Sequence, residues 1–388
     1  MKQILDRLTQ KETVLRVAKV AYCYTIFGYF GLNYVLEQGV GVSSALSSLL
    51  IYALLAYKII LTRYTKKEMV VGAGLFTLAG ISLYLRKDTT ILTNVIVLFS
   101  LKNVDIDSLL KPLFWSALAG SILVASCSYV GIGLPMSITK VFREERGIET
   151  RYCFGYGHPN PFHMYMVRLM CLFAGTFYKK LDWRHLTGLA IFNLMIFAFS
   201  DSRTGMLGGF ALILLLLIYR YGGAVVNSKT WNVLMAAGMA AVIAFGFLSV
   251  LLWGKVPGLD VINGFFTRRI EFSYVAWQEV GFSAWGRDLL GNYPCDNGMI
   301  NMMVTYGWVA AAVYWISTLG LYAKALRERR HYLTIILVIF AVCTVMESAV
   351  SEKIFRNIPM MYMSLLIFGD PLVQEDSTII EKTSKNLV

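Results

Sequence analysis

Charged residues are scarce in this sequence. Asp, Glu, Lys and Arg make up 15% of its 388 residues, whereas apolar residues make up 57%. A soluble domain carries about 25% charged residues, which help to cover its surface with polar groups. This chain has too few of them for such a surface, so its composition excludes a soluble fold and predicts an all-α polytopic membrane protein.

Several chemical signatures are also missing. The sequence has no Cys-x-x-Cys pair, Walker loop, Rossmann glycine pattern, HExxH helix or nucleophile elbow. Each of these patterns is tied to its own kind of metal, nucleotide or hydrolase site. The net charge of +12 is spread over many short loops, which fits loops facing anionic lipid better than a nucleic-acid-binding face. We therefore expect no metal, no cofactor and no nucleic-acid partner.

Long apolar runs are what the sequence does contain. A helix needs roughly 20 apolar residues to span a bilayer. Runs near that length occur at 17–36, 42–61, 69–85, 113–134, 161–178, 185–200, 203–221, 231–253, 298–323 and 332–348. Two shorter runs, 88–101 and 357–371, raise the predicted number of spans from ten to twelve. The polar, basic start lacks a signal-peptide cleavage pattern and is expected to be a cytoplasmic tail before a retained span.

The distribution of basic residues predicts the topology. With the N-terminus inside, about 22 of the 36 basic residues lie in cytoplasmic segments and about 13 in outer ones, which favours both termini inside. Residues 1–371 are then one transmembrane domain with outer loops at about 135–160 and 254–297, and 372–388 form a polar cytoplasmic tail. Within the second loop, "RRIEFSYVAWQ" predicts an amphipathic helix at the membrane surface.

The motif "SDSRTG" joins two apolar runs through a very short link. Arg203 is thereby predicted to lie near bilayer depth, where charges are costly and usually functional. A guanidinium presents a planar fork of donors that suits phosphate oxygens, and Ser202 and Thr204 add hydroxyls. In the alternative reading, Asp201 and Arg203 only pair with each other and cap a helical hairpin.

The stretch "FGYGHPNPFH" holds two of the four histidines of the chain. Its prolines fit the first turn of a helix, with Asn160 predicted as the cap and His158 just outside. His158 is a candidate to exchange protons or to contact a sugar or phosphate; alternatively it only satisfies a local carbonyl. Arg151, just upstream, lies in a segment that mostly reads as a solvated loop.

Two further motifs follow in the second outer loop. In "TRRIEF", Arg268 and Arg269 point differently on a helix, so one is expected to face inward, although a basic surface helix is an equal alternative. In "CDNGMINMM", Asp296 and Asn297 precede an apolar run, which is typical N-cap chemistry. A carboxylate there is also a candidate to accept a proton from a hydroxyl.

The order of these motifs resembles the O-antigen ligase/polymerase superfamily, and most closely the Wzy-type polymerases of bacterial capsular and exopolysaccharides. The resemblance covers about residues 150–360. It rests on "FGYGHPN", then "SDSRTG" opening a span, a loop arginine, "LLGNY" leading into "DNGMINMMVTYG", and "ESAVSEKIFRN" with Glu347 and Asn357.

This resemblance implies a GT-C-like glycosyltransferase of the cytoplasmic (inner) membrane. Its donor would be a polyprenyl-diphosphate-linked oligosaccharide on the outer face, and its acceptor another lipid-linked repeat unit. A flippase and a chain-length regulator of the same pathway are implied partners. Arg203, and Arg269 or Arg268, match arginines expected to bind the diphosphate, and Asp296 or His158 is the candidate base. The remaining residues expected to contact substrate are Arg151, Asn160, Ser202, Asn297 and Glu347.

Two alternative functions remain open at the level of sequence. A ligase of the same superfamily usually has a histidine where this chain has Asp296, which favours a polymerase. A transporter or flippase of lipid-linked glycans also needs about a dozen spans and basic residues. Its charges should line a path to both sides, whereas the motifs here gather on one predicted face.

Overall fold

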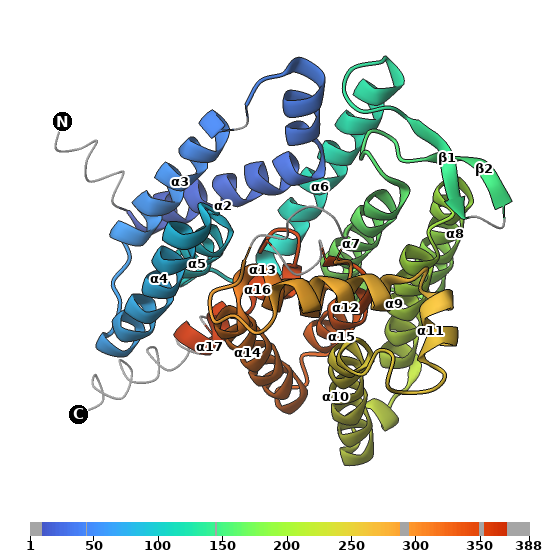
Figure 1. Cartoon of the computed structure of the whole chain (residues 1–388). Helices are drawn as coiled ribbons and strands as arrows, with labels where there is room; N and C mark the ends of the chain where they lie inside the picture. Colours follow the sequence, from blue (N-terminus) through green and yellow to red (C-terminus); the bar gives the residue numbers. More distant parts are fainter. Residues whose placement is uncertain (1–9, 44, 144–145, 288–294, 349–352, 371–388) are drawn as a thin grey trace, which may run out of the picture.

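The computed structural model describes residues 10–43, 45–143, 146–287, 295–348 and 353–370. Its helical elements (Figure 1) are α2 (Lys11–Phe27), η1 (Gly28–Leu32), η2 (Val35–Val40), α3 (Ala45–Ile60), α4 (Lys66–Arg86), α5 (Thr90–Ser100), α6 (Ile106–Tyr129), α7 (Pro159–Phe177), η4 (Tyr178–Lys180), α8 (Trp183–Ser200), α9 (Arg203–Tyr221), η5 (Val225–Asn227), α10 (Lys229–Leu251), α11 (Leu259–Phe265), α12 (Arg269–Val280), α13 (Gly298–Tyr306), α14 (Trp308–Arg327), α15 (His331–Met346), α16 (Ile358–Met361) and α17 (Ser364–Phe368). One hairpin, β1 (Ser137–Arg143) and β2 (Gly147–Tyr152), completes the elements.

The helices are consistent with an all-α membrane protein. Among the described residues, five helices are long and apolar enough to cross a bilayer: α4, α6, α9, α10 and α14. Further apolar helices are shorter, at Ser48–Ile60, α5, α15 and Ile358–Phe368. In α4 and in α10, only 22% of the most apolar 18-residue stretch is buried inside the protein. Most of the apolar surface of these two helices therefore remains for contact with lipid. The twelve spans and their topology stay predictions.

Four expectations need correction. The run 17–36 is α2 followed by two wide π-helical segments, η1 and η2, and the run 357–371 contains two short helices, α16 and α17. The run 298–323 is two helices broken at Gly307, whose φ is +88°. The outer loop 135–160 contains the antiparallel hairpin β1–β2, with Ser137 opposite Tyr152, so the fold is not purely helical.

The break at Gly307 has a packing cause. A Cβ on Gly307 would lie 2.2 Å from the carbonyl oxygen of Ala284, and the amide of Trp308 donates to the carbonyl of Ser283. The backbone of 283–287 therefore packs against the helix break, which requires a glycine at φ +88°. This divides the predicted long span into α13, close to the outer motifs, and α14.

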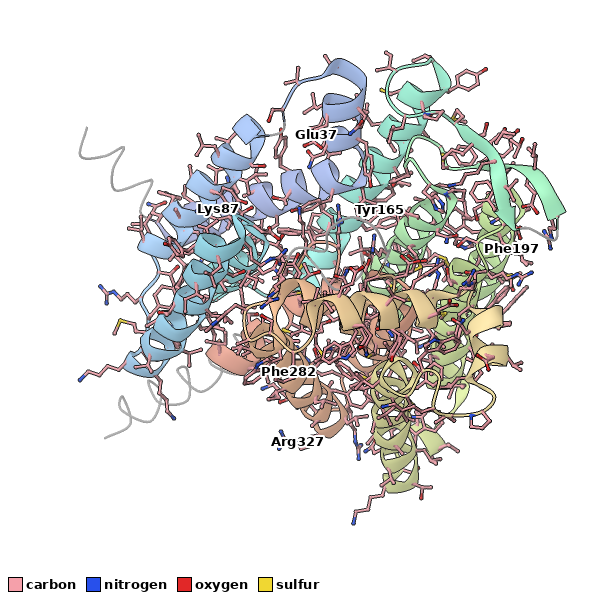
Figure 2. The ribbon with its side chains drawn as sticks, viewed as in Figure 1. Glu37, Lys87, Tyr165, Phe197, Phe282 and Arg327 are labelled. Atoms are coloured by element: carbon pink, nitrogen blue, oxygen red, sulfur yellow. The ribbon has the colours of Figure 1, made fainter. Side chains whose placement is uncertain are left out.

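The centre of the bundle is formed by α7, α9 and α15. Helix α7 packs against α6, α8 and α9, and α15 packs against α9, α10 and α14. In α15, side chains on all sides are buried, because neighbouring helices surround it. Side chains fill the space between these helices (Figure 2). The loops at one end of this central group carry His158, Ser202, Arg203 and Glu347.

The direction of each central helix shows which connections lie at the same end of the bundle. The start of α7, the α8–α9 link and the end of α15 lie together, because Ser200 bonds His163 and Thr204 bonds Glu347. The α7–α8 and α14–α15 connections must then lie at the opposite end. Those connections carry the basic residues Lys179, Lys180, Arg184, Arg327, Arg329 and Arg330.

Candidate functional site

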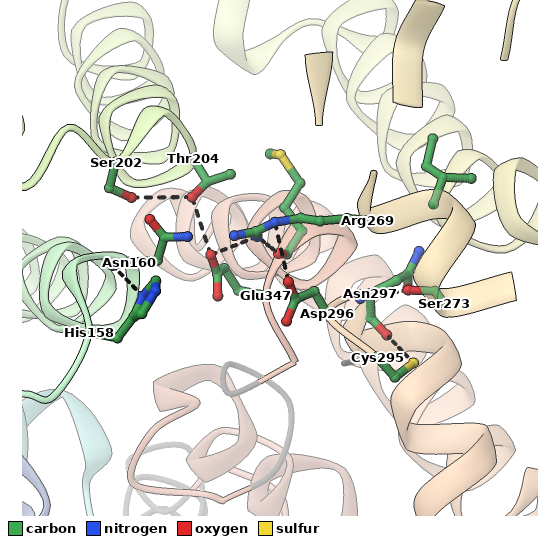
Figure 3. Close-up of polar contacts among 12 residues, drawn as sticks. His158, Asn160, Ser202, Thr204, Arg269, Ser273, Cys295, Asp296, Asn297 and Glu347 are labelled. Carbon is green, nitrogen blue, oxygen red and sulfur yellow. Dashed lines mark hydrogen bonds and ion pairs between the residues drawn. The ribbon is translucent and has the colours of Figure 1, made fainter. Parts of the chain in front are cut away.

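Arg269 is the centre of the site (Figure 3). It is the first residue of α12 and only 7% exposed. Its Nη1 donates to Glu347 Oε1 at 2.7 Å and to the carbonyl of Met346, and its Nε lies 3.4 Å from Asp296 Oδ2. Arg268, by contrast, is exposed and pairs with Glu271 at 2.7 Å. Of the two adjacent arginines, Arg269 is therefore the one that faces inward.

Glu347 connects this arginine to the "SDSRTG" motif. It follows the last residue of α15 and accepts a hydrogen bond from Thr204 Oγ1 at 3.2 Å. Burial raises the pKa of Glu347, and the Arg269 guanidinium offsets part of that rise. Burial would lower the pKa of Arg269, but Glu347 and Asp296 outweigh it and raise the pKa of the guanidinium. Each group therefore counteracts the effect of burial on the other.

Asp296 and Asn297 are neighbours with different surroundings. Asn297 is the N-cap of α13: its Oδ1 accepts from the amides of Met299 and Ile300, and its Nδ2 donates to the carbonyl of Gly246 at 2.8 Å. These bonds commit its amide to the fold, while its contact with substrate stays a prediction. The side chain of Asp296 is 36% exposed and is held by Arg269, so its carboxylate is both oriented and accessible.

His158, not Asn160, caps α7. The Nδ1 of His158 accepts from the backbone amide of Asn160 at 3.3 Å, which corrects the predicted cap. Since Nδ1 is an acceptor, the neutral ring carries its proton on Nε2. Burial, together with the positive charges of Lys140, Arg269 and Arg151, lowers the pKa of His158 to about 4. His158 is therefore a neutral hydrogen-bond donor at pH 7.

The alternative reading, in which Asp201 pairs with Arg203, is not what the structure shows. Asp201 ends α8 in a left-handed conformation (φ +46°) and pairs with Arg151 at 2.9 Å and with Arg146 at 3.1 Å. Arg151 is buried and also pairs with Glu149, so it is not the solvated loop residue predicted from sequence. These bonds hold the β1–β2 hairpin against the start of α9.

Arg203 remains available for a ligand. It is the first residue of α9, partly exposed, and adjacent to Thr204, which bonds Glu347. No hydrogen bond or ion pair involves it within the described part of the chain. Ser202 is the N-cap, with its Oγ accepting from the amide of Gly205 at 3.4 Å, so its hydroxyl has a structural role beside any contact with substrate.

Six helix ends gather around these side chains. Four helices begin there: α7, α9 and α13, capped by His158, Ser202 and Asn297, and α12, whose first residue is Arg269. Two helices end there, at Asp201 (α8) and Glu347 (α15). The N-terminus of a helix carries partial positive charge and unpaired amide donors. Four such ends, together with Arg203, make this region suitable for an anion.

The second histidine of "FGYGHPNPFH", His163, positions the α8–α9 link. His163 is completely buried, with Nδ1 3.1 Å from Ser200 Oγ and Nε2 3.0 Å from Asn193 Oδ1. Asn193 Nδ2 donates to the carbonyl of Met206, so its oxygen is free to accept from His163 Nε2–H. The glycine of "SRTG" was the one sequence sign of this contact, because only a residue without a Cβ leaves room for the His163 ring at position 205.

Replacing Gly205 by alanine is expected to destabilise the protein by about 1–3 kcal/mol. An added Cβ would lie 2.2 Å from His163 Cγ and would push the ring away from Ser200 and Asn193. The measurement is thermal unfolding in detergent. Gly188→Ala in α8 is the matched control, because nothing lies within 4 Å of its added Cβ. Equal unfolding temperatures for the two variants would contradict this packing.

The histidine cap also predicts an acid sensitivity. The pKa of His158 is lowered from 6.5 to about 4 in the folded protein, so the unfolded chain takes up the proton first as pH falls. The stability contributed by neutral His158 is therefore present above pH 6.5 and lost between 6.5 and 4. We expect His158→Gln to lose less stability than the wild type between pH 7 and 4.5 in thermal unfolding. An identical loss in both proteins would argue against the lowered pKa.

Within the residues that the structure describes, no group of three or more His, Cys, Asp or Glu side chains is arranged to hold a metal ion. Comparisons with protein-family models, with curated proteins and with solved structures find no match to this chain. The geometry of the site therefore carries the functional argument.

Proposed function

We propose that this chain is a membrane glycosyltransferase that polymerises lipid-linked glycan repeat units, as in Wzy-type polysaccharide biosynthesis. Its donor is a polyprenyl-diphosphate-linked glycan, and its acceptor is a sugar hydroxyl of another lipid-linked unit. The observation that carries the proposal is one cluster of an oriented carboxylate, a buried arginine and an available arginine at the converging helix ends. Leaving-group stabilisation and proton removal are the two tasks of this reaction, and the cluster provides for both.

The diphosphate is assigned to Arg203 and the surrounding helix N-termini. Arg203 has no protein partner among the described residues, whereas Arg269 is already engaged by two carboxylates. Arg269 is therefore a positioning residue in this proposal, in contrast to the diphosphate-binding role implied by the family resemblance. Forked contacts from Arg203 stabilise the negative charge that grows on the leaving diphosphate. The isoprenoid chain lies along the apolar helix surfaces.

Proton removal is assigned to Asp296, one of the two candidates from sequence. Its carboxylate is exposed enough to meet a sugar hydroxyl and is oriented by Arg269. His158 is less suited, because its pKa is about 4 and its Nδ1 already accepts a backbone hydrogen bond. Its Nε2–H is instead placed to donate to a sugar hydroxyl or to a phosphate oxygen.

The proposed step is a single displacement. An acceptor hydroxyl attacks the anomeric carbon of the donor glycan while the bond from that carbon to the phosphate oxygen breaks. The hydroxyl proton passes to Asp296, and the polyprenyl diphosphate leaves with its charge balanced by Arg203. Buried Glu347 remains paired with Arg269 and so keeps the guanidinium in place to orient Asp296.

The arrangement of charges supports an extracytoplasmic site in the cytoplasmic membrane. The links α7–α8 and α14–α15 are rich in Lys and Arg and lie at the opposite end of the helices from Arg269. Basic loops are enriched on the cytoplasmic side. With those links inside, the cluster faces outward, where completed lipid-linked repeat units become available for polymerisation.

The test is incubation of the purified full-length protein in detergent with lipid-linked repeat units. Growth of the glycan chain is the expected result. A single transfer to another acceptor would identify a ligase, and no reaction in an assay that a known polymerase passes would overturn the proposal.

Replacing Asp296 by asparagine is expected to lower the transfer rate by about 10²–10⁴-fold, the usual contribution of a general base. Binding of the lipid-linked donor should change little, because Arg203 and the helix ends remain. The matched control is Asp260→Asn, at an exposed position of α11, which should retain the wild-type rate. Equal rates for the two variants would remove Asp296 from the role of base.

A further inference from the structure

A polar cavity lies away from the Arg269 cluster. Its volume is about 290 Å³, and its lining comes from η1 and η2, from α3, from α5 and from residues 353–356. Leu134 is the one aliphatic side chain among the twelve lining residues. Polar side chains facing a cavity in a chain this apolar are costly unless they meet water or a polar ligand. The cavity therefore calls for a polar occupant.

The side chains in this cavity indicate the chemistry of that occupant. Two cations, Lys353 and Arg356, lie near the ring of Tyr29, with Lys353 Nζ and Arg356 Cζ each 5.7 Å from its centroid. Glu37, labelled in Figure 2, is the single carboxylate of the lining, so cations exceed carboxylates by one. Arginine and lysine suit phosphate oxygens, and the excess positive charge favours an anion.

Hydroxyls, amides and aromatic rings complete the lining. Asn33 and Gln38 offer amides, and the hydroxyls of Tyr52 and Thr93 lie 2.7 Å apart across α3 and α5. Amides and hydroxyls both donate and accept hydrogen bonds, as sugar hydroxyls do, and tyrosine rings offer flat apolar faces for a pyranose. Phosphate-binding cations beside sugar-binding groups favour a glycosyl phosphate.

The same structural elements also line an apolar cavity. The faces of α5 differ: Thr89 and Thr93 border the polar cavity, whereas Ile91 and Leu98 border an apolar one of about 270 Å³. Residues 353–356 also face both cavities: Lys353 and Arg356 line the polar one and Ile354 lines the apolar one. The amide of Ile354 donates to Asn94 Oδ1 of α5 at 3.0 Å. A polar, cationic cavity and an apolar one on shared elements indicate an amphipathic ligand.

This cavity is distinct from the Arg269 cluster. None of its lining residues contacts Arg269, Asp296 or Glu347 through a hydrogen bond or ion pair that the structure describes. The two regions adjoin through α7, which is capped by His158 and carries Tyr165 about two turns further on. The hydroxyl of Tyr165 lies 3.5 Å from that of Tyr34, a lining residue.

We propose that the polar cavity binds the glycosyl diphosphate head of a second lipid-linked unit, the acceptor, while the donor occupies the Arg203 site. This inference rests on the proposed function. A polymerase needs two lipid-linked substrates at once, and two separate cationic regions avoid placing two diphosphates in one pocket. The acceptor's distal sugar must then reach Asp296 from the side of α7.

The test counts ligands by native mass spectrometry of the full-length protein, with farnesyl diphosphate as the lipid probe. The wild type should bind two probes at saturation and Lys353→Gln/Arg356→Gln only one. Asn33→Asp, which adds a carboxylate to the cavity with little change of shape, should weaken the second binding event at least tenfold. Lys66→Gln/Lys67→Gln, exposed at the start of α4, removes the same charge elsewhere and should still bind two.

The outcomes separate the two proposals. If the wild type binds one probe and loses it only in Arg203→Gln, the cavity proposal is wrong while the donor site stands. If Lys353→Gln/Arg356→Gln keeps two probes, the second site lies elsewhere and the proposal is again wrong. If soluble glucose 1-phosphate binds the cavity as tightly as the lipid probe, its ligand is a free sugar phosphate rather than the acceptor. Absence of any binding would contradict both proposals.

Discussion

Arg269→Gln is expected to abolish glycan transfer and to destabilise the protein by about 3–5 kcal/mol, the usual cost of breaking a buried ion pair from one side. Arg269 is 7% exposed and donates to Glu347 at 2.7 Å. Without it, Glu347 is left buried with no compensating cation, and Asp296 loses the group that orients it. Thermal unfolding and the transfer assay in detergent measure the two effects separately.

A double substitution distinguishes these effects. Arg269→Gln/Glu347→Gln leaves no buried charge uncompensated, since the remaining carboxylate, Asp296, is 36% exposed, so most of the lost stability should return while transfer stays absent. The control is the adjacent Arg268→Gln, which breaks an exposed pair with Glu271 and should cost about 0–1 kcal/mol. Full activity in the double variant would show that Arg269 does not orient the base.

Arg203→Lys is expected to lower the transfer rate by about 10²–10³-fold, the range seen when one donor to a developing negative charge is lost. Lysine keeps the charge but lacks the planar fork that holds two phosphate oxygens at once. Because no hydrogen bond or ion pair joins Arg203 to another described residue, the unfolding temperature and membrane insertion should change little. The readout is polymer length in cells and transfer rate with the purified protein.

A matched control for this variant is Arg184→Lys, exposed near the start of α8 at the opposite end of the helices. It should behave as the wild type in both assays. Polymer of near-normal length in Arg203→Lys would remove Arg203 from the diphosphate-binding role, and Arg269 would then be the next guanidinium to test.

Much of the helical framework could be predicted from the sequence. The runs 203–221 and 185–200 correspond closely to α9 and α8, because polar residues with strong capping chemistry bound each apolar stretch: Asp182 and Ser202 cap these two helices. The helix predicted within 254–297 is α12. Periodicity and caps are local properties, so local sequence suffices for them.

The departures depend on contacts distant in sequence. Nothing near Gly307 in sequence requires a break; the reason is the backbone of Ala284 lying against it. The hairpin at 137–152 is stabilised from outside by Asp201, which pairs with Arg146 and Arg151. Hydropathy does not reveal contacts between distant residues. The sequence therefore predicted a continuous span at 298–323 and a loop at 135–160.

In the site, too, the sequence indicated individual residues but not the contacts between them. The sequence identified Arg269, Asp296 and Glu347 as candidates, yet their pairing spans up to 78 residues and no local pattern specifies it. For Asn160 and Arg151, contact with substrate stays a prediction; what the sequence did not reveal is that His158 forms the cap and that Arg151 pairs with Asp201. The structural role of His163 was not predicted, because a histidine at the start of an apolar run gives no local sign of its partners.

The sidedness of the Arg269 cluster tests the central claim most directly. Arg146→Cys places a thiol on the exposed partner of Asp201, beside the cluster, and Lys179→Cys places one in the α7–α8 link at the opposite end. Each is treated in intact spheroplasts with a membrane-impermeant maleimide, with the wild type reporting any labelling of the six native cysteines. We expect labelling at position 146 from outside, and at 179 only after permeabilisation. The reverse pattern would place the guanidinium and carboxylate groups in the cytoplasm and contradict the account.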